Sequence, residues 1–204
     1  MKNLNRLIFT TLLVFAIGNV NAQDENNPWQ IAIGVNAVDV FPVGEDAPQG
    51  DYFQEFYNVE DHWSILPSIS VISLQKYVED GFSMGVSASI NRLDKWGQTQ
   101  DGTAVSVNNL MYYAIDGNVK YSLSELFNTK KLEPFVGFGG GFTWIEEGSF
   151  NTSSDSAGSG LAGAGTLNGT VGLAYWFSDN VGITAQSTYK HSFQDQLTKH
   201  FQHS

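Results

Sequence analysis

Stretches in which apolar residues alternate with small or polar ones recur along the chain. Residues 82–91 are the clearest case, because every second position is apolar: Phe82, Met84, Val86, Ala88 and Ile90. A period of two is typical of a β-strand with one apolar face and one polar face. Seven such stretches predict an all-β fold, with strands at residues 29–40, 63–77, 82–93, 111–123, 132–145, 166–177 and 181–193.

The connections between the predicted strands differ systematically in length. Long polar segments lie at residues 41–62, 94–110 and 146–165, whereas only residues 78–81 and 178–180 separate two other pairs of strands. Short turns at one end and long loops at the other are typical of outer-membrane barrels, whose consecutive strands run up and down. The pattern therefore predicts an antiparallel up-and-down β-barrel.

Aromatic residues near the ends of the predicted strands indicate which face of this barrel is apolar. Rings of Trp and Tyr are favoured at the two lipid–water interfaces of a membrane. The strands also carry few charges, whereas about 25–35% of a soluble surface is Lys, Arg, Glu or Asp. We therefore expect a transmembrane barrel with its apolar face toward lipid, rather than a soluble lipocalin-type barrel with its apolar face toward a ligand inside. The expected interfacial aromatics are Trp29, Trp63, Tyr77, Tyr113, Tyr121, Trp144, Tyr175 and Tyr189.

The other face of the strands is expected to fill a narrow interior. An eight-stranded barrel has room inside for side chains only, which suits the glycines and serines that this face carries. Charges that point inward lose their hydration and must find partners. We predict a polar network in the interior, which either holds the barrel together or gates an ion path. Its expected members are Lys76, Asp116, Lys120, Gln186 and Lys190.

The first 22 residues have the pattern of an export signal. Lys2 and Arg6 provide a basic start, residues 7–17 are apolar, and residues 20–22 (Val-Asn-Ala) form a cleavage site. The apolar run is too short for a membrane-spanning helix. We therefore expect a signal peptide at residues 1–22 and a barrel domain at residues 23–204, located in the outer membrane.

Composition and spacing argue against several functional classes. The formal net charge of −11 disfavours nucleic-acid binding, and the absence of cysteine excludes disulfides and Cys-based zinc sites. His200 and His203 are three residues apart but have no evident third metal ligand. His191, Ser192 and Asp195 offer the residue types of a hydrolase, but no G-x-S-x-G motif is present. We predict no enzyme activity and no catalytic, cofactor-binding or metal-binding residues.

Three segments carry longer motifs, and the resemblance based on them covers nearly all of the mature chain. They are Gly172-Leu-Ala-Tyr-Trp-Phe-Ser-Asp-Asn-Val-Gly-Ile183 with Thr188-Tyr-Lys-His-Ser-Phe193, Pro134-Phe-Val-Gly-Phe-Gly-Gly-Gly-Phe142, and the opening residues 27–39. These motifs resemble the barrel domain of OmpA-like outer-membrane proteins, and the opening is similar to Bacteroidetes-type members of that family. The resemblance implies eight strands and a structural role in the cell envelope. The implied partners are outer-membrane lipid, lipopolysaccharide and, through a C-terminal domain, peptidoglycan.

The chain departs from this family pattern after Phe193. Residues 194–204 show no eighth alternating stretch, and we expect them to belong to an external loop. An open barrel would leave backbone groups unpaired in lipid, at several kcal/mol each. We therefore expect about seven strands of an eight-stranded barrel, in a fragment cut just before the last strand. Two alternatives to a structural role remain open, a small porin or channel and a lipid-modifying enzyme at the barrel rim.

Overall fold

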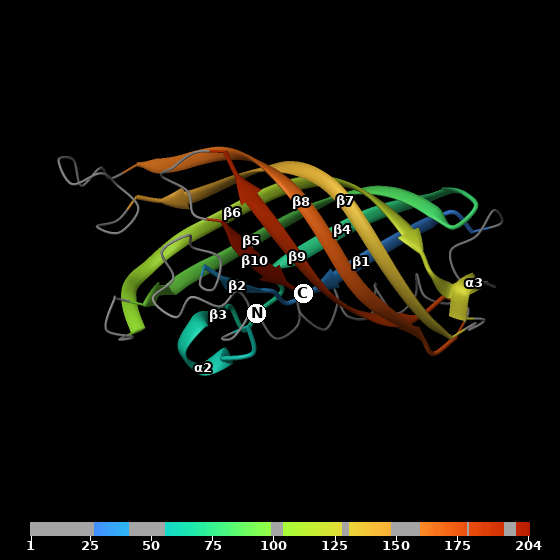
Figure 1. The fold of residues 1–204 in the computed structure, drawn as a ribbon, viewed down its shortest axis with the longest axis horizontal. Coiled ribbons are helices and arrows are strands. Elements are labelled where there is room, and N and C mark those ends of the chain that lie inside the picture. Colours follow the sequence, from blue (N-terminus) through green and yellow to red (C-terminus); the bar gives the residue numbers. More distant parts are fainter. Residues whose placement is uncertain are drawn as a thin grey trace, which may run out of the picture.

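The computed structural model describes residues 27–40, 56–98, 104–127, 131–147, 160–178, 180–193 and 199–204. The predicted signal peptide at residues 1–22 lies outside the described residues. Figure 1 shows the elements in chain order: β1 (Trp29–Gly34), β2 (Ala37–Asp39), α2 (Val59–His62), β3 (Trp63–Ile65), β4 (Val71–Glu79), β5 (Phe82–Gln98), β6 (Ala104–Ser122), α3 (Ser124–Phe127), β7 (Leu132–Glu146), β8 (Leu161–Trp176), β9 (Gly182–Ser192) and β10 (His200–His203). Within this described part of the chain, no helix is long and apolar enough to cross a membrane.

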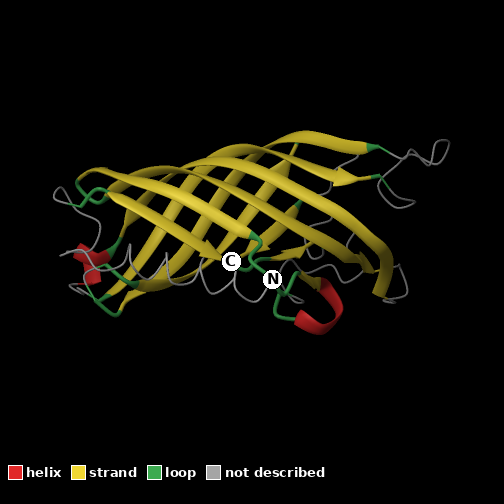
Figure 2. Ribbon diagram, turned by 180° about the vertical axis from the view of Figure 1, so that it is seen from behind, coloured by secondary structure: helices red, strands yellow, loops and turns green. Residues whose placement is uncertain are grey.

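The described strands form one antiparallel sheet in the order β1-β4-β5-β6-β7-β8-β9-β10-β2-β3. β1 and β2 are two parts of one interrupted pass of the chain, and so are β3 and β4, which makes eight passes among the described residues. The first pass pairs with the second through β1–β4 and β2–β3, and with the last through β2–β10. The sheet therefore curls round on itself, as the crossing strands of Figure 2 show. The prediction of an all-β, antiparallel up-and-down barrel is confirmed.

β10 corrects the expectation that residues 194–204 belong to a loop. Phe201 pairs with Tyr189 of β9 on one side and with Asp39 of β2 on the other. The strand has only four residues and one apolar side chain, which is too little for a recognisable alternation. Its backbone pairing with two neighbours makes it a strand, and hydropathy alone cannot reveal that. Residues 194–198 lie outside the described residues.

The interruption between β3 and β4 shifts the alternation by one residue. Ile69 is exposed on the outer face, and alternation alone would place Val71 there too. Instead Val71 pairs with Ser89, which is buried in the interior, and Ile72 takes the outer position with 53% of its surface exposed. The break is stabilised inside the barrel, where the backbone N–H of Asn36 donates to Ser70 Oγ at 2.8 Å. Polar side chains thus satisfy the backbone where the ladder stops.

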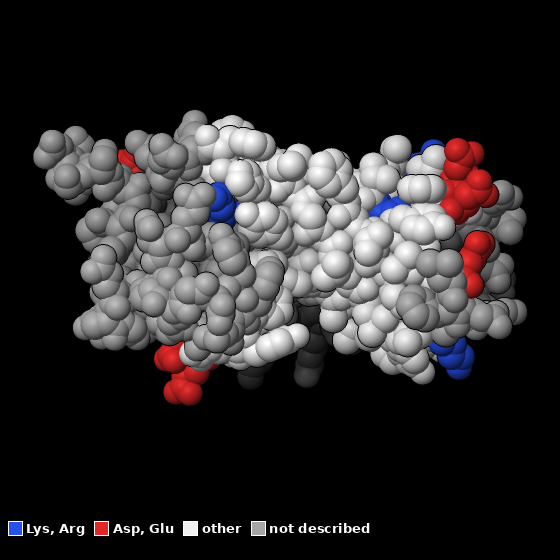
Figure 3. All heavy atoms as spheres, viewed as in Figure 1, with Lys and Arg blue, Asp and Glu red and all other residues white. Residues whose placement is uncertain are grey.

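Large apolar side chains lie mainly on the outer face of the barrel. Ile31, Phe138 and Val171 are each more than 60% exposed, whereas the inward Ser89 and Asn168 are nearly buried. In Figure 3 the described charged residues gather toward the two ends of the visible face and leave an uncharged band between them. The lipocalin-type alternative, which needs its apolar face inside, is therefore wrong.

The interior at the long-loop end holds an apolar cluster that the sequence pattern did not reveal. β5 and β6 extend well beyond the predicted strand ends, because their backbone ladder continues after the outer apolar positions stop. The extension of β6 adds Leu110 to the inner face, where it joins Leu93 and Tyr112 from the predicted strands. The buried members of the cluster are Val38, Val40, Leu93, Leu110, Tyr112, Ala114, Ile145, Ala162 and Ala164.

Candidate functional site

The candidate site is the polar network inside the barrel, centred on Asp116 of β6. Lys190 of β9 places its Nζ atom 2.6 Å from Asp116 Oδ2, and Asn168 of β8 donates to Asp116 Oδ1 at 2.7 Å. The Lys190 side chain is 1% exposed. The pair satisfies both charges where water cannot reach Lys190, which is what a buried ion pair requires.

A second group of contacts connects this network to β10. Tyr112 Oη lies 3.0 Å from His200 Nε2 and donates to Gln202 Oε1 at 3.3 Å. Lys190 lies over the Tyr112 ring at 5.9 Å from its centroid. Tyr112 therefore links β10, which pairs with both β9 and β2, to the Asp116–Lys190 ion pair across the interior.

A third group of contacts lies nearer the short-turn end of the barrel. Lys120 of β6 donates to Gln186 Oε1 at 2.9 Å and lies 4.5 Å from the centroid of the Phe135 ring. Gln186 in turn donates from Nε2 to the hydroxyl of Ser204 at 3.1 Å. Of the five predicted network residues, the structure thus brings together Asp116 with Lys190 and Lys120 with Gln186.

Lys76 is the fifth predicted residue, and its predicted place in the interior is wrong. It lies on the exposed outer face of β4, with Nζ 5.4 Å from the centroid of the Trp29 ring. The same one-residue shift reverses Tyr77, which shares the inward face of Gln75 instead of lying at the outer surface. Both errors follow from the break at Ser70.

Of the other seven predicted interfacial aromatics, six lie on the outer face, and Trp63 is covered by a protein segment. Trp29 and Tyr175 are exposed on the outer face, and Tyr113, Tyr121, Trp144 and Tyr189 are half-buried there. Trp63 differs, because a protein segment covers it. Its ring stacks on His203 with 4.0 Å between centroids, and its indole N–H donates to the carbonyl of Phe56. Trp63 therefore packs against protein rather than being open to the surroundings.

Of the residues considered for other chemistry, those that the structure describes do not assemble into a site. His200 points inward and His203 outward, since they lie on opposite faces of β10 rather than on one face of a helix. His191 contacts Tyr189 at 3.2 Å on the outer face, whereas Ser192 is buried on the inner face. Asp195 lies outside the described residues. Over the described ranges, no group of three His, Cys, Asp or Glu residues could hold a metal ion.

Glycine at position 141 is needed for the network to form. A Cβ atom there would collide with Asp116 Oδ1 and with the carbonyl of Ile115. We expect Gly141→Ala to lower the free energy of unfolding by about 1–3 kcal/mol, the usual effect of overpacking. Gly169→Ala is the matched control, because its Cβ would meet nothing within 4 Å. Urea titration of the folded fraction measures both, and equal stabilities for the two variants would contradict this role.

Comparisons with known proteins give distant structural similarities only. No protein-family model and no curated protein matches the chain. The N-terminal β-barrel domain of Pseudomonas aeruginosa OprF is similar at 13% identity and a TM-score of 0.47, over 85% of this chain and 90% of that one. The attachment invasion locus protein Ail of Yersinia pestis is similar at 14% identity and a TM-score of 0.42, over 86% and 92%. The function of this chain must therefore be argued from its own residues.

Proposed function

We propose that this chain is an outer-membrane β-barrel with a structural role, anchoring in the membrane and contributing to envelope integrity. The observation that carries the proposal is the exposed apolar band on the outer face. Monomeric soluble proteins rarely expose apolar patches beyond a few hundred Å², and here apolar side chains are exposed on seven successive strands from β1 to β9. Export by residues 1–22, contact with lipopolysaccharide, and binding to peptidoglycan through a further domain belong to the same proposal.

The interior favours this structural role over a small pore. The Asp116–Lys190 pair and the Tyr112 contacts cross the interior, and the apolar cluster fills it at the long-loop end. An ion would have to displace buried, mutually satisfied groups to pass. The network therefore supports the role of holding β10, β6 and β9 together, and we assign it no catalytic step.

Membrane fractionation and gel mobility test the proposal directly. The expressed full chain should partition into the membrane fraction and migrate differently with and without heating on a detergent gel. In planar bilayers it should give no steady conductance above that of the lipid. Recovery as a detergent-independent soluble monomer would contradict the membrane location, and a steady conductance would contradict the preference for a structural role.

A further inference from the structure

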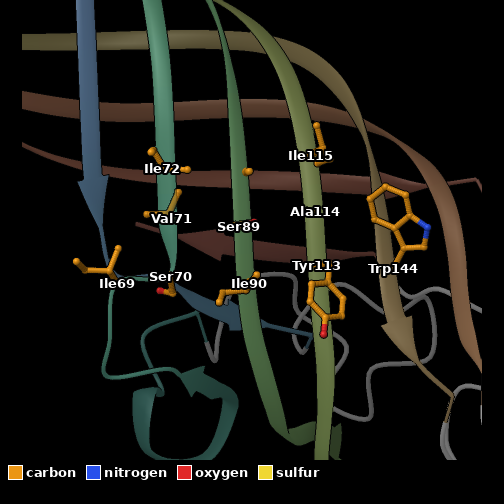
Figure 4. A pocket seen from close by; sticks show the side chains of 11 residues that line it. Ile69, Ser70, Val71, Ile72, Ser89, Ile90, Tyr113, Ala114, Ile115 and Trp144 are labelled. Atoms are coloured by element: carbon orange, nitrogen blue, oxygen red, sulfur yellow. The ribbon is translucent and has the colours of Figure 1, made fainter. Parts of the chain in front are cut away.

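An apolar groove runs along the outer face of the barrel across β4, β5, β6 and β7. Figure 4 shows its lining side chains, which come from these neighbouring strands and from the residues just before β4. Its volume is about 360 Å³, within the range of about 300–1,000 Å³ that is common for ligand pockets. The outward side chains that shape it are Ile69, Ile72, Ala88, Ile90, Tyr113, Ile115 and Trp144.

The groove exists because a small side chain lies between large ones. Ala88 pairs with Ile72 on one side and with Ile115 on the other. Paired residues point to the same face, so the alanine methyl forms a floor between two isoleucines. Both isoleucines are more than half exposed, which leaves the walls of the groove without cover from the described protein.

A cation lies at the long-loop end of this groove. Arg92 is the next outward residue of β5 after Ile90, and it is exposed. Arg92 pairs with Met111, and this is the first outward-facing pair beyond that of Ile90 with Tyr113. None of the ion pairs or side-chain hydrogen bonds of the described residues involves its guanidinium group. Arginine presents a planar fork of N–H donors that matches a phosphate.

We propose that the groove binds one acyl chain of a phosphate-bearing membrane lipid, whose phosphate is held by Arg92. This inference rests on the proposed membrane location. The long-loop end of such a barrel faces outward, which places the lipid in the outer leaflet. The apolar groove and the terminal cation are complementary to the two parts of one lipid molecule.

Both parts of the site are needed for selectivity. Hydrocarbon in a membrane gains nothing by leaving lipid for protein through the hydrophobic effect, so only close packing favours the groove over bulk lipid. The contact of Arg92 with the phosphate adds a charge-assisted bond at the interface. If either the groove or the Arg92 charge is removed, the site should bind phosphate-bearing lipid no more strongly than the rest of the outer face does.

Photo-crosslinking tests the site in nanodiscs whose bulk lipid, digalactosyldiacylglycerol, carries no phosphate. The probes are phosphatidic acid and diacylglycerol, each with a photoreactive diazirine on one acyl chain, and adducts are located by mass spectrometry. We expect phosphatidic acid to label the peptides of residues 69–72, 88–90 and 113–115 preferentially. Ala88→Phe should fill the groove and reduce this labelling roughly tenfold, equivalent to about 1.4 kcal/mol. Arg92→Gln should bring phosphatidic acid down to the level of diacylglycerol.

Matched controls use the same substitutions elsewhere on the outer face. Ala185→Phe enlarges another exposed alanine, on β9, and Lys76→Gln removes the outward cation near Trp29. Neither control should change labelling of the groove. Labelling spread evenly over the apolar band, or unchanged by Ala88→Phe, would overturn the lipid site. Each sample is first tested for heat-modifiable mobility, and failure of the wild-type chain to insert would instead overturn the proposed membrane location and the inference with it.

Discussion

Replacing Lys190 by methionine is expected to lower the free energy of unfolding by about 3–5 kcal/mol, the usual loss when one partner of a buried ion pair is removed. Methionine has a similar length but removes the charge that lies 2.6 Å from Asp116 Oδ2. Asp116 would keep the hydrogen bond from Asn168, but its charge would be uncompensated in the barrel interior. The fraction of heat-modifiable protein, measured against urea concentration in lipid vesicles, gives the change in stability.

Two further variants separate the lost charge pair from lost packing. Lys76→Met removes an exposed lysine of the outer face and should cost less than about 1 kcal/mol. The double variant Asp116→Asn with Lys190→Met removes both charges and should recover much of the loss, because no isolated charge remains buried. The role of the pair is contradicted if Lys190→Met destabilises no more than Lys76→Met.

Alternation predicted the barrel well where one face is uniformly apolar. In β5 the outward Met84 and Val86 alternate with inward Ser83 and Gly85, and the structure keeps this phase from Phe82 to Arg92. The same rule places Asp116 and Lys190 inside, because each occupies a position on the polar face of a regularly alternating strand. Local pattern and fold agree there, which is why inference from single residues succeeds.

The sequence could not predict features that depend on distant pairing. A break of the ladder at Ser70 shifts the phase by one residue, and a one-residue shift moves every later side chain to the opposite face. Lys76 and Tyr77 were misplaced for this reason. Asn36 and Asn91 stabilise the break through a 2.7 Å hydrogen bond between their side chains, but they are far apart in sequence, and no local pattern connects them.

The contribution of Tyr112 was missed for a related reason. It lies in the run Met111-Tyr112-Tyr113, where large side chains occupy both faces of β6 and the alternation disappears. Its partner His200 belongs to β10, which hydropathy does not identify as a strand. The only indication in the sequence is the position of Tyr112 relative to Asp116. Both have even numbers, so on one regular strand they point to the same face. Extending the phase of a clear strand into its ambiguous end would have placed Tyr112 inside.

Introducing a charge at the middle of the outer face should reveal whether that face contacts lipid. Val171 is 61% exposed and lies six residues before Phe177 on the chain, about 20 Å along a strand. With the usual tilt this is close to the centre of an apolar band about 25 Å tall. We expect Val171→Arg to lower the free energy of unfolding in lipid vesicles by about 2–4 kcal/mol, as for arginine at the bilayer midplane.

Val181→Arg is the matched control, because it makes the same change beside the short turn between β8 and β9. Val181 is also exposed, at 42%, but at the edge of the band an arginine can reach the interface, and we expect a loss of about 0–1 kcal/mol. The difference between the two variants depends on depth in a bilayer and not on contacts within the protein, since both side chains point away from it. If the face were in water, arginine would be tolerated at both positions, and equal stabilities would contradict the membrane-spanning barrel. A loss at Val171 that disappears at Val181 would show that the alternating apolar residues serve as the membrane-contacting surface of the barrel.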